Sequence, residues 1–249
     1  MSVPFKFVVM ADWDDVPHLS KSEKDELIAS IPPHQRDART KGVPQLGSGA
    51  IFPVPETDVL VEDFDIPPHY ARGYGMDVGW NCTAVVWLAY DRETTVSYIY
   101  AVHKRGEAEP SVHADAIRTR GHWIPGRIDP AARGRGQRDG SRLLEDYVDQ
   151  GLFLDVAPNA VEAGLLDVWR LLSTGRLKVF QSCKPWIEEF RLYRRDEKGR
   201  IVKQNDHLMD ATRYVILSGV DWLTVEPEAE KDPVVRFIES GTETLGWMH

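Results

Sequence analysis

Three aspartates lie where predicted apolar elements end or begin. Asp77 ends the strand-like run YGMDVGW, Asp129 lies between Ile128 and Pro130, and Asp210 lies among apolar residues near the start of a predicted helix. Burial of a carboxylate is costly unless it is paired, hydrogen-bonded or bound to a metal ion. Carboxylate oxygens without paired cysteines favour Mg²⁺ or Mn²⁺ over zinc. Three of them suit two metal ions that act on a phosphodiester.

Each aspartate also has a simpler structural interpretation. Asp77 would end a strand and cap a turn, and Asp129 would form an Asp-Pro turn. For either residue alone, the structural role is the more frequent one. Taken together, the three acids favour a metal centre, because two lie at the tips of separate strands and the third lies at the start of a later helix.

The run QNDHLMDATRY places further polar groups beside Asp210. On a helix that starts near Asp206, residues 206 and 210 are i,i+4 neighbours, and His207 and Asp210 are i,i+3 neighbours. All three can therefore crowd one end of one helix face. Asp206 is either a metal ligand or the N-cap of the helix, a role for which Asn205 competes.

Basic residues gather in the middle of the chain, although the net charge is −9. The segment 118–142 is rich in arginine, and the predicted hairpin RLYRRDEKGRIVKQ carries a second basic group. Such groups suit contact with phosphates. A solvated loop and an exposed hairpin that blocks edge pairing are the alternatives. The candidate DNA-binding residues are Arg133, Arg135, Arg191, Arg194, Arg195, Lys198, Arg200 and Lys203.

Strands and helices alternate around these residues. The predicted strands are 5–10, 72–79, 83–91, 95–103, 125–130, 152–157 and, less regular, 177–180. The predicted helices are 20–31, 110–121, 141–151, 159–175, 184–193 and 206–219. Short turns between the strands of 72–103 predict an antiparallel meander, and the later alternation predicts a mixed α/β sheet with helices on both faces. Residues 42–68, rich in Gly and Pro, are predicted to form a linker or strap.

Local signals mark the predicted helix ends. Ser20 with Glu23, and Asn159 with Glu162, match the capping box. Pro110 is placed to begin one helix, and Gly175 to end another.

Length and composition indicate an ordinary globular protein. The chain has 249 residues, of which 42% are hydrophobic and 28% charged. No stretch approaches the roughly 18 apolar residues of a membrane span, and the start lacks a secretory signal. Cys82 and Cys183 have no metal-ligand spacing and are predicted to be reduced thiols. We expect a soluble cytoplasmic protein without a membrane partner.

Five runs together resemble the nuclease domain of the large terminase subunit of tailed bacteriophages, the DNA-packaging motor protein of the headful type. These runs are WDDVPHLS, PQLGSGAIFPV, YGMDVGWNCTAVVW, RIDPAARG and NDHLMDATRYVI, spread over residues 13–216. The last run is a specific signal because it follows the strand acid and the IDP acid in the same order.

The resemblance implies an RNase H-like fold of the integrase or resolvase type. That fold has a mixed five-stranded sheet, three strands antiparallel and two parallel, and here an auxiliary β-hairpin. The metal-binding carboxylates map onto Asp77, Asp129 and Asp210, with Asp206 open, and the His-x-x-Asp pair maps onto His207 and Asp210. We expect Asp77, Asp129, Asp210 and His207 to be catalytic.

The implied activity is a two-metal Mg²⁺- or Mn²⁺-dependent endonuclease. It would cut concatemeric viral DNA with little sequence specificity during genome packaging. The implied partners are double-stranded DNA, the portal or procapsid, the small terminase subunit and an upstream ATPase domain. The implied location is the host bacterial cytoplasm, at the procapsid rather than in the mature virion.

The expected organisation has three parts. Residues 1–68 would be a linker and the remnant of an ATPase domain, 69–221 the nuclease domain, and 222–249 an acidic tail. The sequence has no G-x-x-x-x-G-K-[ST] phosphate-binding loop, so we expect no ATPase activity from this chain.

Two other functions stay open. A Holliday-junction resolvase or transposase core would share the fold, although WDDVPHLS and GSGAIFPV disfavour it. A non-catalytic module that docks DNA or the portal is the alternative from a different class.

Overall fold

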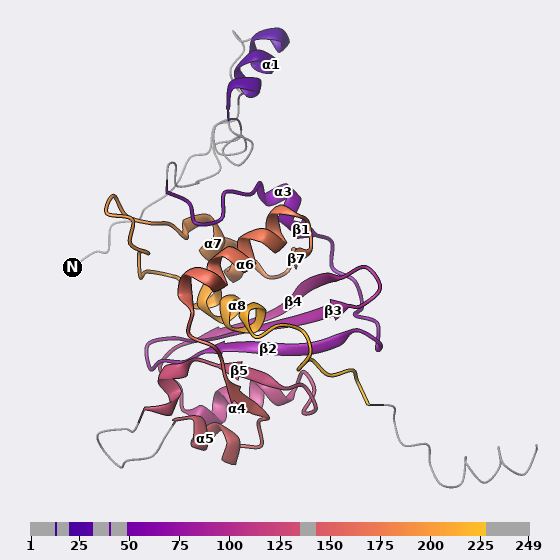
Figure 1. Ribbon diagram of the computed structural model, residues 1–249, viewed down its shortest axis with the longest axis vertical. Coiled ribbons are helices and arrows are strands. Elements are labelled where there is room, and N and C mark those ends of the chain that lie inside the picture. The colour runs from indigo at the N-terminus through magenta and orange to yellow at the C-terminus, as the bar shows by residue number, and fades with distance from the viewer. Residues whose placement is uncertain (1–12, 14–19, 32–39, 41–48, 135–142, 228–249) are drawn as a thin grey trace, which may run out of the picture.

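The computed structural model describes Trp13, Thr40 and residues 20–31, 49–134 and 143–227 (Figure 1). The predicted strand 5–10, most of WDDVPHLS, most of the tail 222–249 and Arg135 lie outside the described residues. The described helices and strands are α1 (Lys21–Ser30), α3 (Glu56–Val59), β1 (Leu60–Val61), β2 (Ala71–Asp77), β3 (Thr83–Asp91), β4 (Val96–Arg105), α4 (Pro110–Arg118), β5 (Gly126–Ile128), the 3-10 helix η3 (Pro130–Arg133), α5 (Leu143–Asp149), β6 (Leu154–Val156), α6 (Val161–Ser173), β7 (Leu177–Phe180), α7 (Lys184–Leu192) and α8 (His207–Leu217).

A mixed sheet forms the centre of the fold. Over the described residues it has seven strands, in the order β1-β7-β4-β3-β2-β5-β6. The antiparallel meander of β2, β3 and β4 is confirmed, and β5 and β6 extend it in parallel from β2. On the other side β7 pairs in parallel with β4, and β1 with β7. The sheet therefore contains the five expected strands and two more.

Of these two, β7 confirms the predicted strand 177–180, and β1 comes from the region predicted to be a linker or strap. β1 is only two residues long, so alternation of side chains could not reveal it. Phe52 and Val59, from the same Gly- and Pro-rich region, are buried in the main core. The prediction of a linker or strap over residues 42–68 did not include this packing, because a two-residue strand and single buried residues leave no periodic pattern in the sequence.

Helices cover both faces of the sheet, as predicted. Figure 1 shows α6, α7 and α8 on one side and α4 and α5 on the other. In β2, Ala71 packs into the core on the α8 side, whereas Tyr74 and Met76 pack into the core on the α4 side. Because both faces of the central strands are buried, these strands read as nearly continuous apolar runs.

Most of the predicted helix signals are confirmed. Ser20 and Glu23 form a capping box on α1, and Pro110 occupies the first turn of α4. The predicted cap at Asn159 is wrong. Helix α6 starts at Val161, so Ala160 holds the N-cap position and no side-chain cap forms; Glu162 pairs with Arg195 instead.

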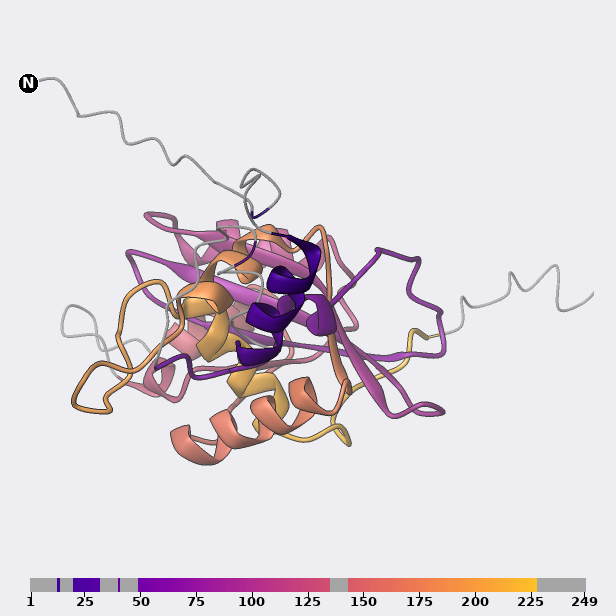
Figure 2. The same ribbon diagram turned by 90° about the horizontal axis from the view of Figure 1, so that it is seen from above.

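The auxiliary hairpin is present between α7 and α8. Arg195 and Ile201 form an antiparallel bridge, and Gly199 at the turn has a φ of 76°, which favours glycine. A bridge between Ala50 and Arg194 ties its base to the segment before α3. The hairpin, drawn in orange, projects from the body at the left of Figures 1 and 2.

Within the described ranges, no helix combines the length and apolar character needed to cross a membrane.

Candidate active site

A glycine in β2 lets helix α8 lie directly against the sheet. A Cβ atom added at Gly75 would lie 2.0 Å from the backbone oxygen of Ala211. Only glycine allows this approach without displacement of backbone. Since Asp77 lies two residues beyond Gly75 and Asp210 directly precedes Ala211, the same contact brings the strand acid and the helix acid together.

Asp77 and Asp129 lie at the ends of neighbouring parallel strands. Met76 of β2 is in register with Ile128 of β5, and the Asp129 N–H donates to the Met76 carbonyl at 2.9 Å. The carboxyl ends of neighbouring parallel strands lie at the same edge of a sheet. The prediction that both acids lie at strand tips is confirmed. The Asp129 carboxylate also accepts from the Ala131 N–H at 2.9 Å; it forms the expected turn at Pro130 and in addition caps η3.

Asp77 is buried and paired with the first residue of α8. Its Oδ2 lies 2.8 Å from Nδ1 of His207, and the residue is 9% exposed. Burial raises the pKa of Asp77 to about 6; repulsion from Asp210 and Asp129 adds to this, and the His207 contact opposes it. The His207 pKa is raised, chiefly by the hydrogen bond to Asp77. Each of the two groups therefore affects the protonation of the other.

Asp210 and Asp206 are buried beside two cations. The ammonium of Lys203 lies 2.8 Å from Asp210 Oδ2 and 2.9 Å from Asp206 Oδ2. Asp210 Oδ1 also accepts from Arg213, at 3.1 Å and 3.2 Å. Asp206 holds the N-cap position of α8 without a side-chain cap bond. The cap interpretation of its carboxylate is therefore wrong, because that carboxylate faces Lys203 instead of the helix amides.

The donor atoms suit a divalent metal ion, although they are not yet gathered around one point. Asp129 and Asp210 are close enough to Asp77 for their charges to act on it. Over the described residues, however, no three His, Cys, Asp or Glu side chains meet as a ready metal-binding group. Asp129 is turned to η3, and Asp210 is held by its cations. Their hard oxygen donors are of the kind that Mg²⁺ and Mn²⁺ prefer.

A buried acid in α7 holds the start of α8. Glu189 is 1% exposed; its Oε2 accepts from the Leu208 N–H at 2.7 Å, and its Oε1 lies 2.6 Å from the Lys104 ammonium. This contact satisfies a free amide of the first helical turn and fixes the turn that carries His207. Sequence reasoning missed Glu189, since no local pattern links residue 189 to residue 208.

The candidate DNA-binding residues divide into paired and free cations. Arg191 binds Glu56 through two nitrogens at 2.6 Å. Arg195 forms an ion pair with Glu162, and Arg200 forms one with Asp196. Those of the predicted set that form no ion pair among the described residues are Arg133, Arg194 and Lys198. Their contact with DNA stays a prediction.

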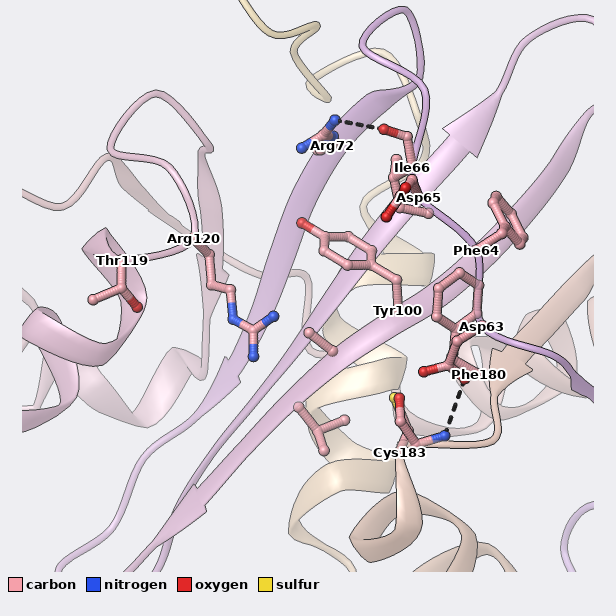
Figure 3. A pocket seen from close by; sticks show the side chains of 13 residues that line it. Asp63, Phe64, Asp65, Ile66, Arg72, Tyr100, Thr119, Arg120, Phe180 and Cys183 are labelled. Atoms are coloured by element: carbon pink, nitrogen blue, oxygen red, sulfur yellow. Dashed lines mark hydrogen bonds between the residues drawn. The ribbon is translucent and has the colours of Figure 1, made fainter.

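A separate cavity lies toward the other face of the sheet. It has a volume of about 860 Å³ and is bordered by Asp63, Arg72, Tyr100 and Arg120 (Figure 3). Asp63 accepts from the Ser182 N–H at 3.2 Å. Asp77 instead points to His207 on the α8 side, so this cavity is distinct from the acidic site.

The match to known proteins covers the acidic site. Residues 74–218 match the family model described as "Terminase RNaseH-like domain". The chain is 37% identical over 208 residues to the terminase large subunit of Salmonella phage P22, which covers 80% of this chain and 42% of that protein. It therefore spans less than half the length of this relative.

Two solved structures share the fold. The P22 large terminase nuclease domain matches with a TM-score of 0.67 and 34% identity, over 74% of this chain and 99% of that one. The large terminase nuclease of thermophilic phage G20c with bound magnesium matches with a TM-score of 0.52 and 16% identity, over 70% and 99%. The family match spans more than half of the chain and includes Asp77, Asp129, His207 and Asp210. This chain belongs to the terminase RNaseH-like domain family.

Proposed function

We propose that this chain is a metal-dependent DNA endonuclease that cuts concatemeric viral DNA during genome packaging. The observation that carries the proposal is the buried Asp77 at the end of β2, which is paired with His207 of α8 and lies close enough to Asp129 and Asp210 for their charges to act on it. The P22 relatives, which bear the names terminase large subunit and nuclease domain, support it.

The same three carboxylates would hold Mg²⁺ or Mn²⁺, with two ions as the expected number. Their oxygen donors fit these ions, and the G20c nuclease of the same fold is described with bound magnesium. Bound ions would supply an activated water and would stabilise the leaving oxygen of the phosphodiester.

The residues of the chain prepare this site. His207 orients Asp77 through its 2.8 Å contact, and Glu189 fixes the turn from which His207 projects. Because metal ligands must be deprotonated, a proton on the Asp77 carboxyl has to leave when a metal ion binds. In this proposal the Asp129 side chain, whose Oδ1 accepts from the Ala131 N–H, would turn toward the other acids.

The substrate is double-stranded DNA held mainly through its phosphates. Arg133, Arg194 and Lys198 are the cations best placed for this role, since they form no ion pair within the described residues. Phosphate contacts position a protein without reading sequence, which accounts for cleavage with little sequence preference. The portal or procapsid, the small terminase subunit and an ATPase domain complete the proposed packaging complex in the host cytoplasm.

Cleavage of supercoiled plasmid tests this function. We expect nicked and linear products with Mn²⁺ or Mg²⁺ and none with EDTA. Asp77→Asn, Asp129→Asn and Asp210→Asn should each lower the rate at least about a hundredfold, as loss of a preorganised charged group does. Asp115→Asn is the matched control, because Asp115 is exposed on α4 at the opposite face.

Two results would contradict the proposal. Unchanged cleavage by the three variants would remove these residues from the site. DNA binding without metal-dependent cleavage by the parent would favour the docking module.

A further inference from the structure

We propose that the Lys203 ammonium serves as an internal cation between the carboxylates of Asp206 and Asp210. A divalent metal ion displaces it, and this displacement releases the second strand of the hairpin, which contains Ile201. This inference rests on the proposed metal-dependent function. It adds a coupling between metal loading and the hairpin.

The position of Lys203 carries the first step. Its side chain is 62% exposed, yet its ammonium lies 2.9 Å from Asp206 Oδ2 and 2.8 Å from Asp210 Oδ2. The two carboxylates are themselves buried, at 5% and 7% exposure. A largely exposed lysine stem is not held by apolar packing, so attraction to the two acids determines where the ammonium lies.

The ammonium satisfies Asp206 only in part. Its 2.9 Å approach to Asp206 Oδ2 is an ion pair without hydrogen-bond geometry, and no other donor from the described residues reaches this buried oxygen. Buried carboxylate oxygens are ordinarily hydrogen-bonded or bound to metal. The Asp206 oxygen is thus a donor that a metal ion near Asp210 could use.

Lys203 is the cation that is able to leave. Arg213 is buried within α8 and reaches Asp210 from three residues along the same helix. Lys203 instead follows the hairpin strand at Ile201 and has solvent on most of its surface. An ammonium and a divalent ion on the same oxygens repel each other, so occupancy by one disfavours the other.

Displacement would loosen the hairpin. The Val202 N–H donates to the Arg194 carbonyl at 3.0 Å, directly beside Lys203. Loss of the Lys203 contacts removes one attachment of this strand to the rest of the protein. It also leaves the Lys203 ammonium available to contact phosphate. A metal-loaded site would in this way present a more mobile and more basic hairpin to DNA.

Mn²⁺ binding measured by titration calorimetry tests the proposal in Lys203→Met, Lys203→Arg and Lys198→Met. Lys198 provides the matched control because it is exposed on the same hairpin and forms no ion pair in the described structure. We expect Lys203→Met to bind Mn²⁺ roughly fivefold more tightly or better, the size of one ion pair removed from competition. Lys203→Arg and Lys198→Met should bind like the parent.

Two further readouts do not depend on activity. In EDTA, Lys203→Met should melt at a lower temperature than the parent because Asp206 and Asp210 lose a counter-ion, and saturating Mn²⁺ should remove this difference. Mn²⁺ should also speed hydrogen exchange of the amides of residues 194–203 in the parent and leave it unchanged in Lys203→Met.

The role of Lys203 would be overturned if Lys203→Met bound Mn²⁺ no more tightly than the parent and if Mn²⁺ did not change hydrogen exchange in the hairpin of the parent. The proposed metal-dependent function would not be affected by this result. Failure of the proposed function looks different, since neither protein would then bind Mn²⁺, and both proposals would fall.

Discussion

Asp77 should make the metal-free protein less stable at about pH 8 than at about pH 5. Burial raises its pKa to about 6, from 3.8 in an unfolded chain, so the folded state binds a proton more tightly than the unfolded state. The stabilisation from this proton is complete below the unfolded pKa and is lost as the pH rises through about 6. The difference between a pKa of about 6 in the folded state and 3.8 in the unfolded state lowers the free energy of unfolding by about 3 kcal/mol at alkaline pH.

His207 acts in the same direction. Its pKa is raised, mainly by the hydrogen bond to Asp77. The stability from a protonated histidine is present below the unfolded pKa and is lost as the pH rises through the folded one. Both members of the pair therefore predict a fall in stability between about pH 5 and pH 8 when metal is absent.

Asp77→Asn isolates the contribution of the carboxylate. Asparagine keeps the volume and a hydrogen-bonding group for His207 but has no charge to desolvate. In EDTA at about pH 8, its free energy of unfolding should exceed that of the parent by up to about 3 kcal/mol. The two proteins should converge toward pH 4. Urea unfolding across this pH range, followed by circular dichroism, measures the difference, with Asp115→Asn as the control.

A variant that is less stable than the parent at about pH 8, or that keeps the full pH dependence, would refute this reasoning. Saturating Mn²⁺ should stabilise the parent more as the pH rises, because metal and proton compete for the same carboxylate.

Two further predictions concern the other acid and the hairpin. Asp129→Asn keeps an acceptor for the Ala131 N–H, so its melting temperature in EDTA should match or exceed that of the parent while most of the Mn²⁺-induced rise disappears; Asp129→Ala should lose about 1 kcal/mol. An equal loss in both variants would assign Asp129 to capping alone. Charge reversal at Arg194 and Lys198 should weaken DNA binding and flatten its log–log salt dependence by about 0.9 for each lost contact. Fluorescence anisotropy over a salt series measures this slope, and a parental slope would exclude the hairpin from the DNA interface.

The parts of the site that sequence could predict depend on short-range patterns. Asp77 and Asp129 each follow apolar strand residues directly, and His207 and Asp210 share a helix face through their spacing. Tight turns between β2, β3 and β4 also predict their antiparallel pairing. In each case the deciding interaction lies within a few residues along the chain.

The parts that sequence could not predict depend on pairs of residues far apart in the chain. Glu189 caps the turn at Leu208, and Arg191 is held by Glu56; neither partner carries a local signal. Lys203 was predicted to contact DNA, and only the folded structure shows its ammonium between Asp206 and Asp210. The two-residue strand β1 could not be predicted either, because its partner β7 lies over a hundred residues away in the chain.

The most direct test of the metal-centre assignment is a crystal structure of the protein soaked in Mn²⁺, with anomalous difference maps. We predict anomalous density bounded by the carboxylates of Asp77, Asp129 and Asp210, with the Asp129 side chain turned away from the Ala131 N–H. Absence of anomalous density among these three carboxylates, at a Mn²⁺ concentration that supports DNA cleavage, would contradict the account.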